Sequence, residues 1–451
     1  MSRKIELRDI LLFVVTTLAT ILLALLVIRW FAPTLLGLPA DMVLVKSSRE
    51  VPPFYENIFN NKAEDSEEFM IKDPVVRVRG RPFIQNLGGI GPNDILGFRN
   101  LSVPHEADVI TIGDSMTYGN NAYIWQNWPS LLKFYIPDGK VIYSMAAGGW
   151  GALQYVYAFA KSLHFKPRLV IVAFYTGNDP IDTYSLARAS KLWREFVPEG
   201  VNLGDYSLPR AEYPAPKDQQ WHVEFPDGTG TVFTPALRNA SNQMVKSIDI
   251  AYAIMVNVAR KIKELADRKQ VQVFYTIIPT KEYVYSEKIR QAGMEMDAAY
   301  KGLVENEGRR IASFARALQE ISPGAYIDVA DRLKQEALKA ERLYPSDING
   351  HPLPAGYGVI ADEVGKKIAT VFKTAESAGV YLSKTVNGLV LPVIVRNHRF
   401  WIITGDSNGL AQKTGLKELP ALEMRELYGL EFGGYVDVQK VIEAQQAHAA
   451  P

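Results

Sequence analysis

The sequence predicts an α/β fold whose parallel sheet is covered by helices on both faces. Short, almost uninterrupted apolar runs alternate with stretches of helical periodicity. Strands that are apolar throughout are typical of a sheet buried on both faces, and alternation of strand and helix favours parallel strands. The predicted strands are Val109–Ile112, Val141–Met145, Leu169–Tyr175, Val271–Ile278 and Ala325–Val329, and the predicted helices lie near 126–136, 151–163, 247–267, 300–320 and 355–374.

The composition is that of a globular protein and excludes several classes of site. The 451 residues are 47% hydrophobic and 22% charged, which is ordinary for a folded protein. A net charge of +1 argues against a nucleic-acid partner, and the lack of cysteine excludes disulfides, thiolate metal sites and a thiol nucleophile. The histidines show no metal-ligand spacing and there is no Gly-rich phosphate loop. We therefore expect neither a metal nor a cofactor.

The N-terminal segment predicts a membrane anchor. Ile10–Ile28 carries no charge and, as a helix, would span about 28 Å, close to one hydrocarbon core. The basic residues before it favour a cytoplasmic N-terminus. The run is longer than the apolar part of a cleaved signal peptide and continues into Arg29 and Trp30. We therefore prefer an uncleaved single-pass anchor over a cleaved signal or a buried helix, with the remaining chain on the far side of the cell membrane.

Changes in composition divide the chain into segments. Residues 1–32 form the predicted anchor, and 33–105 read as a tether and strap with short strands at most. The α/β domain spans 106–380, with an insert at 180–245 whose length suggests a task such as a lid. The insert's aromatic side chains could stack on sugars or fill a small core. Residues 381–451 predict a small β-rich appendix and a polar tail, in which Pro392 indicates an edge strand.

Polar residues and glycines follow the predicted strands at the points where parallel strands of α/β sheets carry their chemistry. Ser115 follows the first strand on a tight turn, Gly149 follows the second, and Asn178 follows the third. Asp347 and His351 follow the fifth. A hydroxyl, an imidazole, a carboxylate and potential oxyanion donors are the parts that acyl transfer requires.

These residues resemble the motif blocks of the SGNH (GDSL) hydrolases. Gly113-Asp114-Ser115 is similar to the first block, Gly149 to the second, Gly177-Asn178-Asp179 to the third and His351 to the last, over roughly residues 105–375. The resemblance implies a three-layer flavodoxin-like sheet, with Ser115 as nucleophile and His351 as general base. It also implies an oxyanion hole made by the N–H groups of Ser115 and Gly149 and the amide of Asn178.

The spacing of the acid departs from the family pattern. The family usually places its acid three residues before the histidine, or sometimes two, and here Ile348 and Asn349 occupy those positions. Asp347 lies one residue further away and is the preferred candidate to complete a triad. The alternative is a Ser115–His351 dyad in which a carbonyl or Asn349 holds the ring.

The expected function is a serine esterase or O-acyltransferase, with acetyl as the expected acyl group. The anchor, strap and insert resemble exported family members that acylate or deacylate cell-envelope polysaccharides. The expected substrate is an acylated carbohydrate or another ester, and the expected location of the catalytic domain is periplasmic. The alternatives are a catalytically inactive carbohydrate-binding scaffold that partners polysaccharide assembly proteins, and a lipid esterase or thioesterase.

Three weaker candidates for substrate binding are Trp221, His222 and Lys281. Each also has an ordinary interpretation, as a core aromatic, a surface histidine and a solvated lysine respectively. A second Gly-Asp-Ser triplet ends at Ser407, but too little chain follows it for the other blocks, so we interpret Ser407 as a turn residue.

The main candidates have structural alternatives too. Asn178 could only cap a helix, and Gly149 could only allow close packing. We expect Asp114 to brace the nucleophile turn rather than to transfer a proton.

Overall fold

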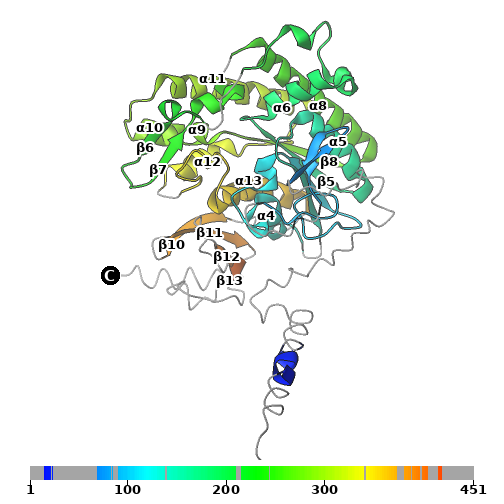
Figure 1. Cartoon of the computed structure of the whole chain (residues 1–451), viewed down its shortest axis with the longest axis vertical. Coiled ribbons are helices and arrows are strands. Elements are labelled where there is room, and N and C mark those ends of the chain that lie inside the picture. Colours follow the sequence, from blue (N-terminus) through cyan, green and yellow to red (C-terminus); the bar gives the residue numbers. More distant parts are fainter. Residues whose placement is uncertain are drawn as a thin grey trace, which may run out of the picture. The chain divides into compact units, whose positions relative to one another are not determined.

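The computed structural model describes most of the chain (Figure 1). The described residues are 15–21, 23, 69–82, 84, 90–137, 140–209, 215–242, 244–339, 342–372, 380–386, 389–396, 399–404 and 415–418. The chain divides into two compact units, Met1–Ser48 and Arg49–Pro451.

In the first unit, the described residues 15–21 and 23 are helical. The apolar side chains of Val15, Leu18, Ile21 and Leu23 are at least half exposed. Within the described ranges, no helix combines the length and hydropathy that crossing a membrane requires. The predicted anchor Ile10–Ile28 falls largely outside those ranges.

The second unit contains a five-stranded parallel sheet, which confirms the predicted α/β class. The strand order is β4-β3-β5-β8-β9, so the first strand of the sheet lies between the second and the third, as in flavodoxin-like folds. Every residue of β3 and β5 is buried, which explains their uninterrupted apolar sequences. The strands are β3 (Val109–Gly113), β4 (Ile142–Ala146), β5 (Leu169–Tyr175), β8 (Gln272–Ile278) and β9 (Tyr326–Ile327).

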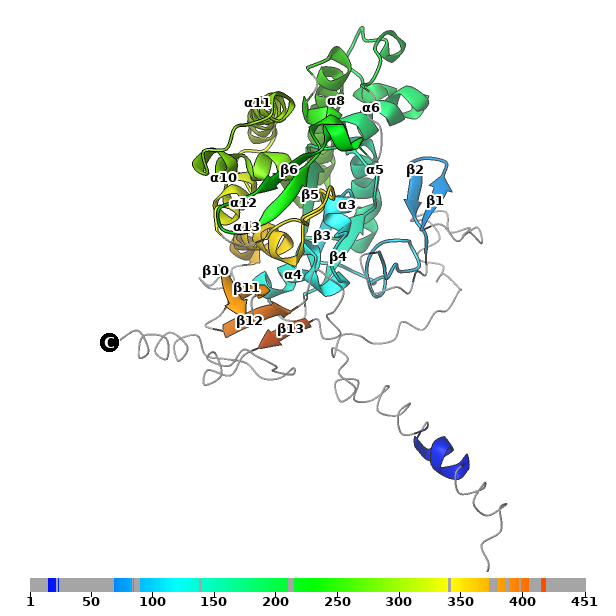
Figure 2. The same cartoon turned by 60° about the vertical axis from the view of Figure 1, so that its left-hand side comes forward.

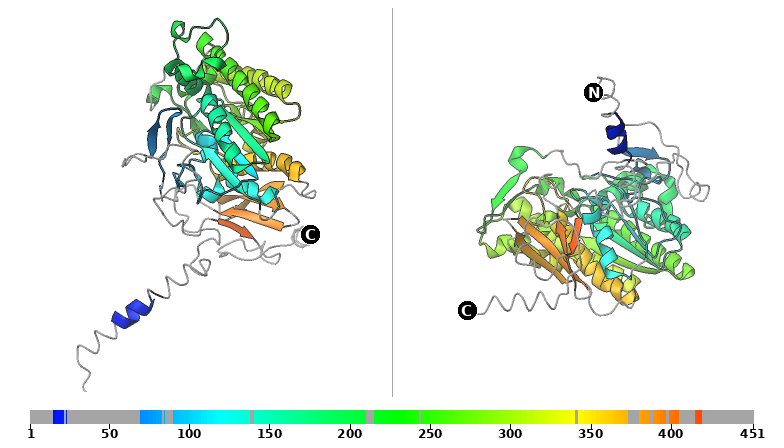
Figure 3. Two further views of the ribbon diagram at one scale, coloured as in Figure 1. Left: turned by 90° about the vertical axis from the view of Figure 1, so that its right-hand side faces the viewer. Right: turned by 90° about the horizontal axis from the view of Figure 1, so that it is seen from below.

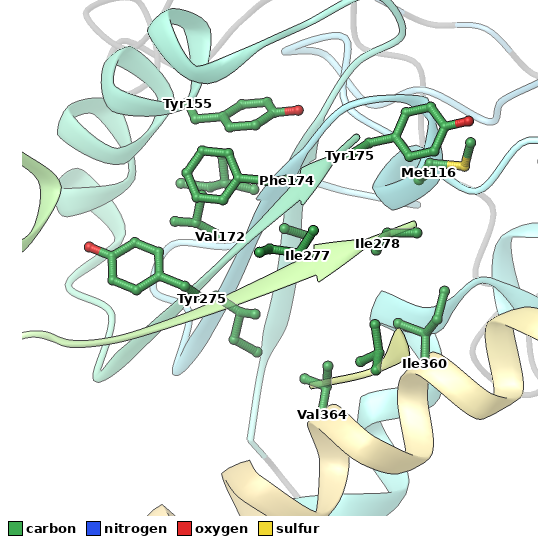
Figure 4. Close-up of a cluster of buried hydrophobic side chains, with 14 of the residues drawn as sticks. Met116, Tyr155, Val172, Phe174, Tyr175, Tyr275, Ile277, Ile278, Ile360 and Val364 are labelled. Carbon is green, nitrogen blue, oxygen red and sulfur yellow. The ribbon is translucent and has the colours of Figure 1, made fainter. Parts of the chain in front are cut away.

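Helices pack on both faces of this sheet. On one face α5 (Ala152–Ser162), α6 (Asp179–Ala189) and α11 (Ala298–Ile321) pack against α8 (Lys246–Lys269). On the other face α13 (Pro354–Phe372) packs against α4 (Trp128–Leu131) and α12 (Ala330–Ala337). Figure 4 shows the strands running between Tyr155 on α5 and the α13 residues Ile360 and Val364.

Some elements differ from the prediction, and α12 was not predicted at all. The helix expected near 126–136 is broken into η2 (Ile124–Gln126), α4 and η3 (Leu132–Tyr135), because Asn127 starts a new turn by capping Ser130 N at 3.0 Å. The fifth strand is only two residues long. α6 begins at Asp179 and occupies the start of the segment predicted as an insert.

The segment before the sheet holds a hairpin of β1 (Met70–Asp73) and β2 (Arg77–Gly80). Figure 2 shows this hairpin beside α5. Two bonds attach it there, because Trp150 Nε1 donates to Val78 O at 2.7 Å and Gln154 Nε2 donates to Val76 O at 3.3 Å. The strap is therefore tied to the α/β body next to the second strand.

The insert folds onto the body rather than standing away from it. It contains the hairpin of β6 (Trp221–Glu224) and β7 (Gly230–Phe233), then η8 (Pro235–Leu237) and α7 (Asn239–Asn242). Five of its aromatic side chains are buried in the main core, namely Tyr184, Trp193, Phe196, Phe225 and Phe233. The packing interpretation therefore holds for these five. Other elements are η4 (Leu163–Phe165), η5 (Lys191–Phe196), η6 (Leu203–Asp205), η7 (Lys217–Gln219), α9 (Lys281–Val284) and α10 (Ser286–Gln291).

A four-stranded antiparallel sheet follows α13 (Figure 3). Its strands are β10 (Val380–Val386), β11 (Leu389–Arg396), β12 (Arg399–Thr404) and β13 (Gly415–Glu418), in that order. The prediction of an edge strand around Pro392 was wrong, because β11 pairs on both sides. Pro392 is tolerated because β12 pairs only with Val393–Arg396, so the missing N–H falls where β11 pairs with β10 alone.

Candidate active site

The candidate site lies at the carboxyl ends of the central strands, where α/β sheets place their ligands. A cavity of about 880 Å³ opens there and is lined by Ser115 after β3, Gly149 after β4, Asn178 after β5 and the loop that carries His351. Its wall includes a set of side-chain amides, Asn120, Asn121, Asn178 and Asn349. Segments far apart in the sequence thus meet around one hollow.

Ser115 is the first residue of α3 (Ser115–Tyr118), and its hydroxyl faces His351. The distance from Ser115 Oγ to His351 Nε2 is 2.8 Å. Asp114 is the N-cap of α3, where Oδ1 accepts from Met116 N at 2.9 Å and Oδ2 lies 3.3 Å from Ser115 Oγ. The carboxylate therefore braces the turn, and burial raises the pKa of Asp114 to about 7.

Asn349, rather than Asp347, lies against the imidazole. Asn349 Oδ1 is 2.9 Å from His351 Nδ1 and 3.0 Å from His351 N. Asp347 Oδ1 instead accepts from Asn349 N at 2.8 Å, so its carboxylate is separated from the ring by Asn349. Among the described residues no hydrogen bond joins Asp347 to the imidazole. Asp347, the preferred acid, thus caps the turn before the histidine, and Asn349, the alternative, contacts the imidazole.

Arg238 lies beside the histidine loop. Its Nε pairs with Glu282 Oε2 at 3.0 Å, and a Cβ on Gly350 would come within 2.3 Å of its Nη2. An alanine at position 350 would therefore force this guanidinium to shift. Burial first, and the positive charge of Arg238 second, lower the pKa of His351 to about 4.

The two other oxyanion candidates line the same cavity. Gly149 has φ of 69°, and a Cβ there would meet nothing within 4 Å, so its conformation rather than close packing favours glycine. Asn178 occupies the N-cap position of α6 without capping it through its side chain. Its Nδ2 donates to Asp182 Oδ2 at 2.7 Å, which uses one of the two amide hydrogens. Burial raises the pKa of Asp182 to about 7.

Lys281 is fully buried, in contrast to the solvated-lysine interpretation. Its ammonium donates to Val232 O at 2.8 Å and to Asp347 O at 2.7 Å, and burial lowers its pKa to about 8. Thr231 Oγ1 also donates to Pro345 O at 3.0 Å. Lys281 and β7 therefore fix the histidine loop through its backbone carbonyl groups at Asp347 and Pro345.

Trp221 and His222 are not among the residues that line the cavity. The ring centroid of Trp221 lies 4.8 Å from that of Tyr300 and 5.6 Å from that of Phe233, and His222 is exposed. Both fit the ordinary interpretation given above. Ser407 lies outside the described residues. No cluster of potential metal ligands occurs within the part of the chain that the structure describes.

Sequence reasoning did not single out Asn121, Arg238 or Asp182. Asn121 has φ of 68°, a conformation that asparagine tolerates better than most residues, so the Gly119-Asn120-Asn121 turn after the nucleophile was a usable signal. Arg238 carried no such signal in the sequence, because its partner Glu282 lies in a distant segment. Comparison of the chain with protein-family models and with curated proteins gave no match.

Proposed function

We propose that this protein is a serine esterase or O-acyltransferase of the SGNH type that acts on acylated cell-envelope carbohydrate. The observation that carries the proposal is the 2.8 Å distance from Ser115 Oγ to His351 Nε2 on the wall of the 880 Å³ cavity. A nucleophile and base within hydrogen-bond reach are the parts that covalent acyl transfer needs.

In the proposed reaction, Ser115 Oγ attacks the ester carbonyl carbon while its proton passes to His351 Nε2. The N–H groups of Ser115 and Gly149 and the amide of Asn178 donate to the oxyanion that forms. The tetrahedral intermediate collapses, the alcohol leaves with the proton from His351, and the acyl group stays on Ser115. Water or a sugar hydroxyl then attacks the acyl-enzyme and gives its proton to His351. The bond between the acyl carbon and Ser115 Oγ breaks, His351 returns the proton to Ser115 Oγ, and the acid or a new ester leaves.

The lining of the cavity supports a carbohydrate rather than a lipid substrate. Four amides and the side chains of Asp182, Arg238 and Asp347 contribute to the wall, beside four apolar side chains, Ile90, Met116, Leu237 and Ile348. Hydroxyl-rich sugars can use such donors and acceptors, and a long acyl chain would desolvate them without replacing their hydrogen bonds. We therefore infer a short acyl group such as acetyl.

We place this activity on the periplasmic side of the cell membrane, with the N-terminal helix as a single-pass anchor. The apolar, exposed side chains of Val15, Leu18, Ile21 and Leu23 support the anchor, because transfer of such side chains from water into lipid lowers the free energy of the helix. Polysaccharide assembly proteins in the same membrane are the expected partners.

One observation favours a non-catalytic carbohydrate-binding scaffold as a second candidate. The side chain against His351 Nδ1 is a neutral amide instead of the carboxylate of the family pattern. The experiment below separates the two candidates, because a scaffold would not react through Ser115.

The test uses the full chain in detergent and a fluorophosphonate probe, together with turnover of an aryl acetate. We expect labelling and turnover in the native protein and loss of both in Ser115→Ala. Ser407→Ala is the matched control, since it removes the serine of the second Gly-Asp-Ser triplet, and it should behave like the native protein. Equal turnover by native protein and Ser115→Ala, or no labelling of the native protein, would refute the proposal.

A further inference from the structure

Two asparagines join the nucleophile turn to the histidine loop. Asn121 follows α3 and Asn349 precedes His351. Asn349 Nδ2 donates to Asn121 Oδ1 at 2.9 Å, and Asn121 Nδ2 donates to His351 O at 3.0 Å. Together with the contacts of Asn349 Oδ1 to His351, these bonds form a closed set around the base.

The backbone fixes which end of each amide points where. His351 N–H can only donate, so the atom of Asn349 that faces it must be the oxygen. His351 C=O can only accept, so the atom of Asn121 that faces it must be the nitrogen. The remaining contact then pairs Asn349 Nδ2 with Asn121 Oδ1, a donor with an acceptor. Reversing either amide would place like groups against each other.

This assignment determines the tautomer of the ring. Asn349 Oδ1 is an acceptor, so the His351 Nδ1 beside it must carry the hydrogen. In a neutral imidazole, Nε2 then has the free lone pair, and Nε2 is the atom 2.8 Å from Ser115 Oγ. The ring is held in the form that can take a proton from Ser115.

We propose that Asn349, itself held by Asn121, orients His351 and fixes its tautomer in place of a carboxylate. The inference rests on the proposed function, and both asparagines act as positioning residues. Because the orienting group is neutral, the imidazolium that forms during the reaction has no negative charge at Nδ1 to stabilise it.

The charges around the ring agree with a base that is hard to protonate. Burial first, and then Arg238 beside Gly350, lower the pKa of His351, whereas the carboxylate of Asp347 accepts from Asn349 N. The titratable and charged groups that face the ring or line its cavity are Asp114 before α3, Tyr175 at the end of β5, Asp182 on α6, Arg238 after η8 and Asp347 in its own loop. We expect the base to remain unprotonated down to about pH 4.

The test is the pH dependence of fluorophosphonate labelling by the full chain. In that reaction Ser115 Oγ forms a bond to phosphorus, fluoride leaves, and the serine proton passes to His351 Nε2. The native protein should lose reactivity only near pH 4. Asn349→Asp puts a carboxylate next to Nδ1, which raises the pKa of the imidazole, so its acid limb should move up by at least about one pH unit. A residue with a purely structural role would not move that limb.

Two further variants test the positioning role without adding charge. Asn349→Ala should slow labelling at neutral pH by about 10³–10⁴-fold, since the tautomer is no longer fixed. Asn121→Ala should slow it by about 10²-fold through misplacement of Asn349. If the two act as one unit, the double variant should be no slower than Asn349→Ala alone. Asn202→Asp, which adds the same charge at an exposed residue, is the matched control and should match the native profile.

The outcomes separate this inference from the proposed function. An unmoved acid limb in a reactive Asn349→Asp protein, or fully additive losses in the double variant, would overturn it. If the native protein is not labelled at all, the proposed function fails. The pKa of His351 can then be followed by NMR of the ring Cε1–H, assigned with His351→Asn. A native pKa below about 5 that rises in Asn349→Asp would still support the inference, and a pKa near the usual 6.5 in both proteins would overturn it.

Discussion

Arg99 offers the sharpest test of how the strap supports the site. Its side chain is 2% exposed, and its guanidinium donates to the carbonyl oxygens of Gly91 and Ala122, each at 2.7 Å, and of Gly119. The last two carbonyls flank the turn that carries Asn121. Replacement by methionine keeps most of the volume and removes every donor.

The loss of stability follows from the carbonyl groups that no longer have a hydrogen-bond donor. Each buried carbonyl that loses its donor costs about 1–3 kcal/mol, and relief of the buried cation offsets part of the total. Burial of the side chain removes water from the cation, which lowers the pKa of Arg99 to about 10. We therefore expect Arg99→Met to lower the free energy of unfolding by about 3–6 kcal/mol. Arg99→Lys keeps the charge and some donors, so its free energy of unfolding should lie between those of the native protein and Arg99→Met.

Urea unfolding of the full chain, followed by tryptophan fluorescence, measures this loss, and fluorophosphonate labelling measures its effect on Ser115. Labelling by Arg99→Met should fall by about 10²-fold because the turn that holds Asn121 is displaced. Arg260→Met is the matched control, since Arg260 is exposed on α8 and bonds Asn257 within the same helix. Its effect should stay within about 0.5 kcal/mol. Stability of Arg99→Met within 1 kcal/mol of the native protein would refute the reasoning.

Three other substitutions have defined outcomes. Gly350→Ala places a Cβ 2.3 Å from Arg238 Nη2, so it should destabilise the fold by about 1–3 kcal/mol and slow labelling, and a native-like melting temperature would contradict this. The lowered pKa of Lys281, about 8 instead of 10.5, means that between these pH values the unfolded chain holds a proton that the folded chain has lost, so stability gains a component that rises with pH. Lys281→Met should remove that component in urea titrations at pH 8 and 10, and an unchanged difference would count against it. The pKa of Asp182, raised from 3.8 to about 7, has the opposite sign, because the folded chain keeps the extra proton. Asp182→Asn should therefore flatten a fall in stability between about pH 4 and 7, and identical pH profiles for the two proteins would exclude this contribution.

The sheet could be predicted because its signal is local. β3, β5 and β8 are apolar along nearly their whole length, and their observed bounds lie within one residue of the prediction. Helix α6 was not predicted because it starts at Asp179, the last residue of the third motif, and carries Asp179 and Asp182 in its first turn. The fifth predicted strand, Ala325–Val329, contains Asp328, and only Tyr326–Ile327 pair with β8.

The site could be predicted only in part. The positions of Ser115, Gly149 and Asn178 follow from strand ends, which the apolar pattern locates, whereas α12 lies between β9 and His351. Which of Asp347 and Asn349 meets the ring depends on the turn between them, and spacing alone does not determine that turn. The burial of Lys281 depends on Val232 and Asp347, which belong to other segments of the chain. Contacts of this kind have no local signature.

The attachment of the histidine loop to hairpin β6–β7 has a consequence for how such a protein can change. Thr231 and Val232 set the position of this loop through Pro345 and Lys281, yet neither takes part in the proposed chemistry. An engineer who trimmed the chain to its motif blocks would delete this support together with the hairpin. Mutations in the hairpin would equally shift the imidazole of His351 relative to Ser115, although every motif residue stays the same.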